Sequence, residues 1–279
     1  MAADIDDTRR ALQPTMLRDL PLGRLPGDCL EVGGVDPAQV RPAWQAARAV
    51  LPRTRRRPVF LSAEPHVLDG FPAARSDAED ALLDRQARTA DPWPPPGTAW
   101  WEIVVPEEEV CLYVREVPGA DLLTEAEEWA AGRTAPITVR KLNRFLFDRV
   151  RTDPDLLAAV PGDDRLTGGW YEPDAVRLVL LPFTEPHLVA GRTDFWGTLA
   201  RPDRLAAILW QWHQRWAAEP VACWDTMLQF TVGRRPASAE AAWDLAVQIK
   251  HLATNLEMDL WEIAVAVTRG DTWFLHSRP

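Results

Sequence analysis

The chain has 279 residues, of which 47% are hydrophobic and 26% are charged, as in an ordinary globular protein. Its formal net charge is −10, and lysine occurs only at Lys141 and Lys250. This charge argues against a nucleic acid or an anionic membrane surface as the main partner, because both attract clustered lysine and arginine.

The N-terminus and the cysteines favour a cytoplasmic protein. The first ten residues, MAADIDDTRR, are acidic and contain no apolar h-region, so we expect no secretory signal. No run approaches the roughly 18 apolar residues of a membrane span. Cys29, Cys111 and Cys223 are far apart and odd in number, which favours free thiols in a reducing compartment.

The first third of the chain predicts short strands that alternate with helices. Expected strands span residues 29–32 and 58–62, and expected helices span residues 37–51 and 76–88. Ser76 and Glu79 have the spacing of a capping box. Four prolines within residues 91–97 cannot continue a helix or a central strand, so we predict a linker or a loop there. The basic residues 53–57 favour a solvated turn over an anion-binding patch.

The middle of the chain predicts a pair of strands followed by helices. Two apolar runs favour strands at residues 100–105 and 110–117. Helices are expected from Thr124 to residue 131 and over residues 138–150, where apolar side chains recur at helical spacing. Residues 161–169, rich in glycine and aspartate, predict a loop.

The last third of the chain is dense in tryptophan and has the clearest pattern of elements. Eight of the 14 tryptophans lie between Trp196 and Trp273. The expected elements are a strand buried on both faces at 176–183, helices over 202–218, 238–255 and 260–267, hairpin strands at 221–224 and 228–232, and a final strand at 273–276. Alternation in the second hairpin strand places Gln229 and Thr231 on a polar face.

Four tryptophans lie on the expected helices at 202–218 and 238–255. Two of them fall on the apolar face of their helix and two do not. At 100° per residue, Trp212 and Trp216 fall on the stripe of their helix, which predicts that both are core residues. Trp210 and Trp243 lie off their stripes. Each of these two either packs in a second layer or is exposed to a partner, since tryptophan is a common anchor of interfaces.

One sequence motif, together with the segments that follow it, resembles a known family. The sequence of residues 209–216 is LWQWHQRW, followed by EPVA at 219–222 and by a helix that opens after Pro236. This pattern resembles the bacterial family numbered 4253 among the domains of unknown function, over roughly the last hundred residues. The resemblance implies the fold of this region and implies no activity. Residues 254–258 and 274–279 depart from the family's usual Cys-Pro-Asp-like turn and aromatic ending.

Candidate chemistry is sparse. The histidines are scattered, so a metal site would need His213, His251 and His276 to converge with Glu257 or Asp259, and no spacing supports this. We therefore expect no metal and no cofactor. His213 with Cys223 could form a nucleophile pair, but a cysteine in an apolar strand is commonly a small core residue. Asp225 stands at the hairpin tip, where aspartate favours turns.

These patterns together predict an α+β fold, with helices packed on a mixed, largely antiparallel sheet. We expect an N-terminal region at 1–97, a middle region at 98–175 and a tryptophan-rich domain at 176–279, or one continuous domain. The expected function is a cytoplasmic module that binds another protein, immunity-like or regulatory, through Trp210 and Trp243. One alternative is an enzyme with a tryptophan-lined pocket that uses His213 with Asp225 or Cys223. A structural accessory subunit is the other.

Overall fold

A mixed sheet organises the fold. The computed structural model describes residues 2–63, 74–94, 99–160, 166, 173–193, 195 and 201–277. Within these residues the sheet has seven strands in the order β1-β2-β4-β3-β5-β6-β7. Their bounds are Leu22–Arg24 (β1), Leu30–Val32 (β2), Arg57–Ser62 (β3), Val176–Leu181 (β4), Ala218–Trp224 (β5), Met227–Val232 (β6) and Thr272–His276 (β7). Only β3 and β5 pair in parallel among these strands.

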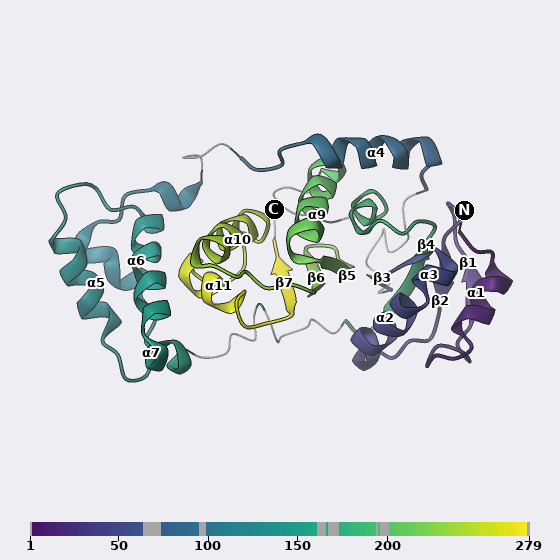
Figure 1. The fold of residues 1–279 in the computed structure, drawn as a ribbon, viewed down its shortest axis with the longest axis horizontal. Coiled ribbons are helices and arrows are strands. Elements are labelled where there is room, and N and C mark those ends of the chain that lie inside the picture. Colours follow the sequence, from purple (N-terminus) through teal and green to yellow (C-terminus); the bar gives the residue numbers. More distant parts are fainter. Residues whose placement is uncertain are drawn as a thin grey trace.

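Helices surround the sheet and extend the molecule beyond it. The α-helices are Ile5–Leu12 (α1), Val40–Ala49 (α2), Leu51–Thr54 (α3), Asp77–Thr89 (α4), Leu122–Ala131 (α5), Val139–Thr152 (α6), Pro154–Ala159 (α7), Pro202–Trp216 (α9), Ala239–Leu252 (α10) and Leu260–Ala266 (α11). Short 3-10 helices are Pro37–Gln39 (η1), Trp100–Glu102 (η2), Glu107–Tyr113 (η3) and Pro186–Gly191 (η4). In Figure 1, α1–α3 lie at the same end as β1 and β2, and α5–α7 lie at the opposite end, beyond α10 and α11. The α+β class is confirmed.

The two faces of the sheet carry separate hydrophobic clusters. Alternate residues of a strand point to opposite faces, so β3 sends Phe60 to one side and Val59 to the other. Phe60 joins the smaller cluster, which α1 and α2 cover with side chains such as Trp44. Val59 joins the larger cluster with α9, α10 and α11. Strand β4 is also divided between both clusters, as the continuous apolar run at 176–183 predicted.

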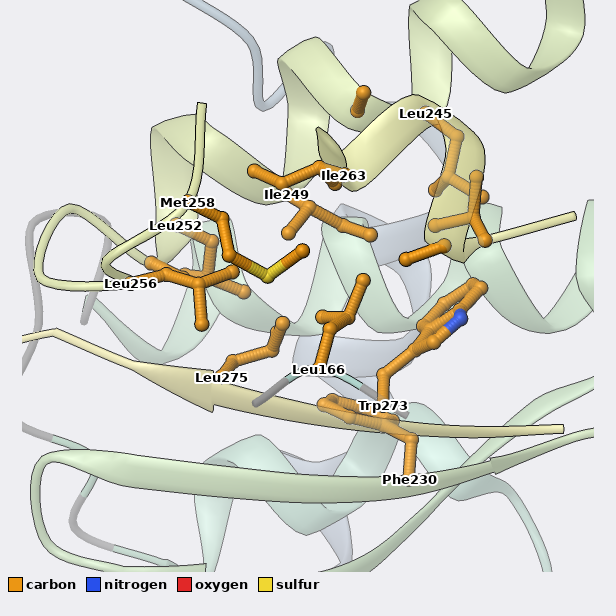
Figure 2. Close-up of a cluster of buried hydrophobic side chains, with 14 of the residues drawn as sticks. Leu166, Phe230, Leu245, Ile249, Leu252, Leu256, Met258, Ile263, Trp273 and Leu275 are labelled. Carbon is orange, nitrogen blue, oxygen red and sulfur yellow. The ribbon is translucent and has the colours of Figure 1, made fainter. Parts of the chain in front are cut away.

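Helices α10 and α11 pack on the strands β6 and β7. Figure 2 shows Leu245 and Ile249 of α10 above Trp273 of β7 and Phe230 of β6. Helical spacing predicts an inward stripe of four leucine and isoleucine residues, and it is confirmed: Leu245, Ile249 and Leu252 of α10 are at most 1% exposed, and Leu256 just beyond the helix is 4% exposed. Helix α11 begins at a capping box formed by Asp259 and Glu262, and the helix expected over residues 260–267 is confirmed.

Helix α9 and the hairpin after it also follow the sequence pattern. Trp212 and Trp216 are 0% and 7% exposed, so the prediction that both are core residues is confirmed. The helix ends at Ala217, which adopts a left-handed conformation. The hairpin of β5 and β6 turns at Asp225, whose positive φ of 54° fits a turn residue. The predicted capping box of Ser76 and Glu79 is confirmed at the start of α4.

The predicted strands at 100–105 and 110–117 are wrong. These residues form the 3-10 helices η2 and η3, and Val104 makes only an isolated bridge to Thr138. Pro106 caps η3 and three glutamates fill its first turn, which is where negative charge stabilises a helix. Val110 is buried against the larger cluster, while Leu112 on the same short helix is exposed. Packing against α5 and α6 therefore replaces strand pairing.

Two polar positions are more buried than the sequence predicts. Gln229, expected on a polar face, is 0% exposed, and it accepts a hydrogen bond from the indole of Trp224 at 2.6 Å. Arg57, expected in a solvated turn, is the first residue of β3 and has only 3% of its side chain exposed. It donates to the carbonyl of Thr184 and pairs with Glu219 of the neighbouring strand β5. Both expectations are wrong: Gln229 finds its partner within the same hairpin, five residues away, whereas the partners of Arg57 are more than a hundred residues away.

Several expectations concern residues outside the described ranges. Residues 95–97 of the proline-rich stretch lie outside them, as do residues 161–169 apart from Leu166. Cys29 and Cys223 are buried free thiols, and Cys111 is an exposed one. Among the described helices, none combines the length and the apolar character that crossing a bilayer requires.

Candidate functional site

The residues of the predicted catalytic set do not come together. His213 lies at the end of α9, and its Nδ1 is 3.2 Å from the carbonyl oxygen of Ala218. Cys223 lies five residues further along β5, about 16 Å from Ala218 at the usual rise of a strand. Asp225 stands beyond Cys223 at the hairpin tip. The structure thus separates His213 from both Cys223 and Asp225.

The two tryptophans predicted to bind a partner have different surroundings. Trp243 is 4% exposed and stacks on Phe147 of α6, with ring centroids 6.0 Å apart. The guanidinium of Arg144 lies 5.4 Å from the centre of the Trp243 ring. Trp243 therefore packs in a second layer between α10 and α6. Trp210 is half-buried and packs against the larger cluster.

A different set of residues forms a pocket, which we call the tryptophan pocket. Its volume is about 200 Å³. The lining residues come from the segment before η2, from η2 itself, from α6 and from α10: Trp93, Pro94, Ala99, Trp101, Glu102, Arg140, Asp244, Val247, Gln248 and His251. The four residues from α10 follow the spacing i, i+3, i+4 and i+7, which places them on one face of the helix, away from the stripe that packs on β7.

The aromatic walls of the tryptophan pocket are held in place by buried contacts. The ring of Trp101 meets the imidazole of His251 edge-on, with centroids 4.5 Å apart and an angle of 64°. Trp93 stacks on Trp212 at 6.2 Å and donates from its indole to Gln211 at 2.8 Å. Gln248 accepts a hydrogen bond from the indole of Trp212 at 2.9 Å. The walls are thus tied to the core beneath α9.

Three charged groups border the pocket. Arg140 donates to Glu102 at 2.9 Å, so these two charges largely neutralise each other. Asp244 is exposed on α10, and within the described ranges it has no ion-pair partner. The pocket therefore presents one uncompensated carboxylate at its rim.

His251 is the titratable group inside the pocket. Burial is the main cause that lowers its pKa to about 4, and the charges of Arg140 and Arg204 contribute to the same shift. The imidazole is therefore neutral at pH 7, with one nitrogen as a donor and the other as an acceptor. In the part of the chain that the structure describes, neither nitrogen has a hydrogen-bond partner.

The lowered pKa of His251 predicts a pH dependence of stability. The pKa of a histidine is near 6.5 in the unfolded chain. Below this pH the His251 ring therefore binds a proton in the unfolded state but stays neutral in the folded state. We expect stability to fall from about pH 6.5 to about pH 4, where the folded state becomes protonated too. Urea unfolding of the wild type and of His251→Gln measures this, because the variant lacks the effect.

His187 is the control for this titration, since its pKa is also lowered by burial. His187→Gln should remove its own contribution and leave that of His251 in place. An NMR titration in which the His251 ring becomes protonated near pH 6.5 would contradict the expectation.

Metal-binding geometry gives no further candidate. Within the described ranges, no three histidine, cysteine, aspartate or glutamate side chains are grouped so that they could hold a metal ion. His213, His251 and His276 do not form such a group with Glu257 or Asp259.

Comparison with known proteins concerns the C-terminal part of the chain. No curated protein matches the chain, and no solved structure matches it. The family model described as Domain of unknown function (DUF4253) matches residues 177–276. The α10 wall of the tryptophan pocket lies inside this segment, while Trp93, Trp101 and Arg140 lie outside it. Residues 177–276 therefore resemble the DUF4253 family, as the tryptophan-rich helix and the hairpin predicted.

Proposed function

We propose that the protein is a cytoplasmic protein-binding module and that a partner inserts one side chain into the tryptophan pocket. The observation that carries this proposal is the size of the pocket together with its lining. About 200 Å³ is less than the 300–1,000 Å³ typical of sites for small molecules and cofactors, and it suits a single side chain. Tryptophan and arginine, which line it, are the residues most enriched at the energetic centres of interfaces.

The chemistry of the pocket favours a cationic side chain, with arginine the best fit. The uncompensated carboxylate of Asp244 stands at the rim, and tryptophan rings attract cations. The neutral His251 offers an acceptor nitrogen, and a guanidinium carries five donors. The net charge of −10 adds long-range attraction to a basic partner. An immunity-like or regulatory protein that acts through contact would fit this description.

The proposal predicts that the protein binds an arginine probe through Asp244. We expect N-acetyl-arginine amide to bind more tightly than its uncharged citrulline analogue in an NMR titration, because only arginine carries the charge. Asp244→Lys should weaken binding of the arginine probe by about tenfold or more, as loss of a charge-assisted contact does. Because Asp244 is exposed, this substitution should leave folding unchanged.

The matched control is Glu127→Lys, which makes the same change of charge at an exposed position of α5. This variant should bind the arginine probe like the wild type. Equal binding of the two probes, or full binding by Asp244→Lys, would count against the proposal.

An enzyme that uses His251 of the tryptophan pocket, in place of the expected His213, is less well supported by the same site. A general base works best when its pKa lies near the working pH, and a pKa of about 4 makes His251 a weak base at pH 7. His251 is better suited to accepting a hydrogen bond than to abstracting a proton. A role as a structural accessory subunit has no specific observation in its favour.

A further inference from the structure

We propose that a second pocket, between α5 and α6, binds a small aromatic anion. This α5–α6 pocket has a volume of about 370 Å³, within the range typical of small-molecule sites. It lies at the end of the molecule formed by α5–α7, beyond α10 and α11 (Figure 1), and wholly outside residues 177–276. The site is separate from the tryptophan pocket and does not depend on the function proposed for it.

Aromatic side chains give the α5–α6 pocket an apolar wall. Trp129 of α5 and Phe145 of α6 stack with ring centroids 4.7 Å apart and an angle of 18°. Both are half-buried, and Ile137 extends the same lining. An aromatic ring of a ligand can pack against such a surface and displace water from it.

The net charge of the side chains that line the pocket is positive, whereas the net charge of the whole protein is negative. Arg133, Lys141 and Arg144 line it against a single carboxylate, that of Asp148. Arg144 is occupied, because it pairs with Asp148 and with Glu240. The pocket therefore holds an excess of positive charge in a chain of net charge −10.

Two of these cations are available to a ligand. Among the described residues, no carboxylate lies within ion-pair distance of Arg133 or Lys141. The guanidinium of Arg133 lies over the Trp129 ring, 4.6 Å from its centre. Lys141 donates one N–H to the carbonyl of Pro136 at 3.0 Å, which leaves two of its three donors. Lys141 stands in the first turn of α6, where the helix dipole favours an anion nearby.

The arrangement selects a small ligand that carries one anionic group on a flat ring. The carboxylate or phosphate would contact Arg133 and Lys141, and the ring would pack on the wall of Trp129 and Phe145. A polyanion such as a nucleic acid is a poor fit, because it would extend from this local patch onto a surface of overall negative charge.

Isothermal titration calorimetry with benzoate, phenyl phosphate and benzyl alcohol tests the proposal. We expect at least one of the two anions to bind, and the neutral alcohol to bind at least about tenfold more weakly. The tighter of the two anions identifies the anionic group. No binding of either anion at millimolar concentration, or equal binding of the alcohol, overturns the proposal.

Variants assign the binding to the α5–α6 pocket. Arg133→Gln and Lys141→Gln should each weaken binding of the anion by about tenfold. Arg85→Gln, at an exposed arginine of α4 with no ion pair in the described part of the chain, should leave it unchanged. Asp244→Lys should also leave it unchanged, which separates this test from that of the tryptophan pocket. Unaltered affinity in a variant lacking both Arg133 and Lys141 overturns the proposal.

Discussion

Replacing Trp212 by alanine is expected to lower the free energy of unfolding by about 3–5 kcal/mol, the usual cost of truncating a buried aromatic side chain. Trp212 is 0% exposed. Its ring meets those of Phe230 and Trp273 edge-on, with centroids 5.8 and 5.4 Å apart, and stacks on Trp93. The substitution would leave a cavity between α9 and the sheet, and it would leave Gln248 without its indole donor.

Urea denaturation of Trp212→Ala measures this loss. Leu82→Ala is the control, since Leu82 is 48% exposed and its truncation should change stability by no more than about 0.5 kcal/mol. A loss below about 1 kcal/mol for Trp212→Ala would mean that the ring does not pack as described. Trp212→Phe should fall between the wild type and the alanine variant, because it retains part of the apolar volume.

Glu219→Gln is expected to cost about 3 kcal/mol at pH 7, because it leaves a buried arginine without its counter-charge. The carboxylate of Glu219 accepts from Arg48 at 2.5 and 2.7 Å and pairs with Arg57, whose side chain is 3% exposed. Asp203→Asn is the control, since Asp203 pairs with Arg201 at the surface and its loss should cost less than about 1 kcal/mol.

The effect of Glu219 should depend on pH in a defined direction. Burial alone would raise its pKa, but the hydrogen bonds and charges of Arg48 and Arg57 outweigh burial and lower the pKa. The stabilisation is therefore fully present above the unfolded pKa of about 4.3 and is lost as the pH falls through the lower folded value. Denaturation at several pH values should show the gap between wild type and Glu219→Gln closing in acid. A gap that is constant down to pH 2 would contradict this explanation.

The elements of the C-terminal third could be predicted because their signals are local. The stripe of α10, the turn at Asp225 and the capping box of Asp259 depend on residues a few positions apart. The segment at 100–117 was predicted wrongly because a short apolar run fits a strand and a buried 3-10 turn equally well. Packing against α5 and α6 decides between them, and α6, which contacts both η2 and η3, comes only after α5 in the chain.

The tryptophan pocket could be predicted only in part. The α10 face that includes Asp244 and His251 has helical spacing and is visible in the sequence. Trp93, Trp101 and Arg140 reach the same pocket from segments whose relative positions depend on tertiary packing. The buried position of Arg57 was unpredictable for a similar reason, since its partners Thr184 and Glu219 are more than a hundred residues away.

The position of β4 has a consequence for the order of events during synthesis. This strand lies between β2 and β3 and pairs with both, but it follows β3 in the chain only after α4, α5, α6 and α7. Since the ribosome releases the chain from its N-terminus, β2 and β3 emerge with no strand between them and with their backbone groups open to wrong pairing. The sheet can close only late in translation. A chaperone that holds the nascent N-terminal strands would act in that interval.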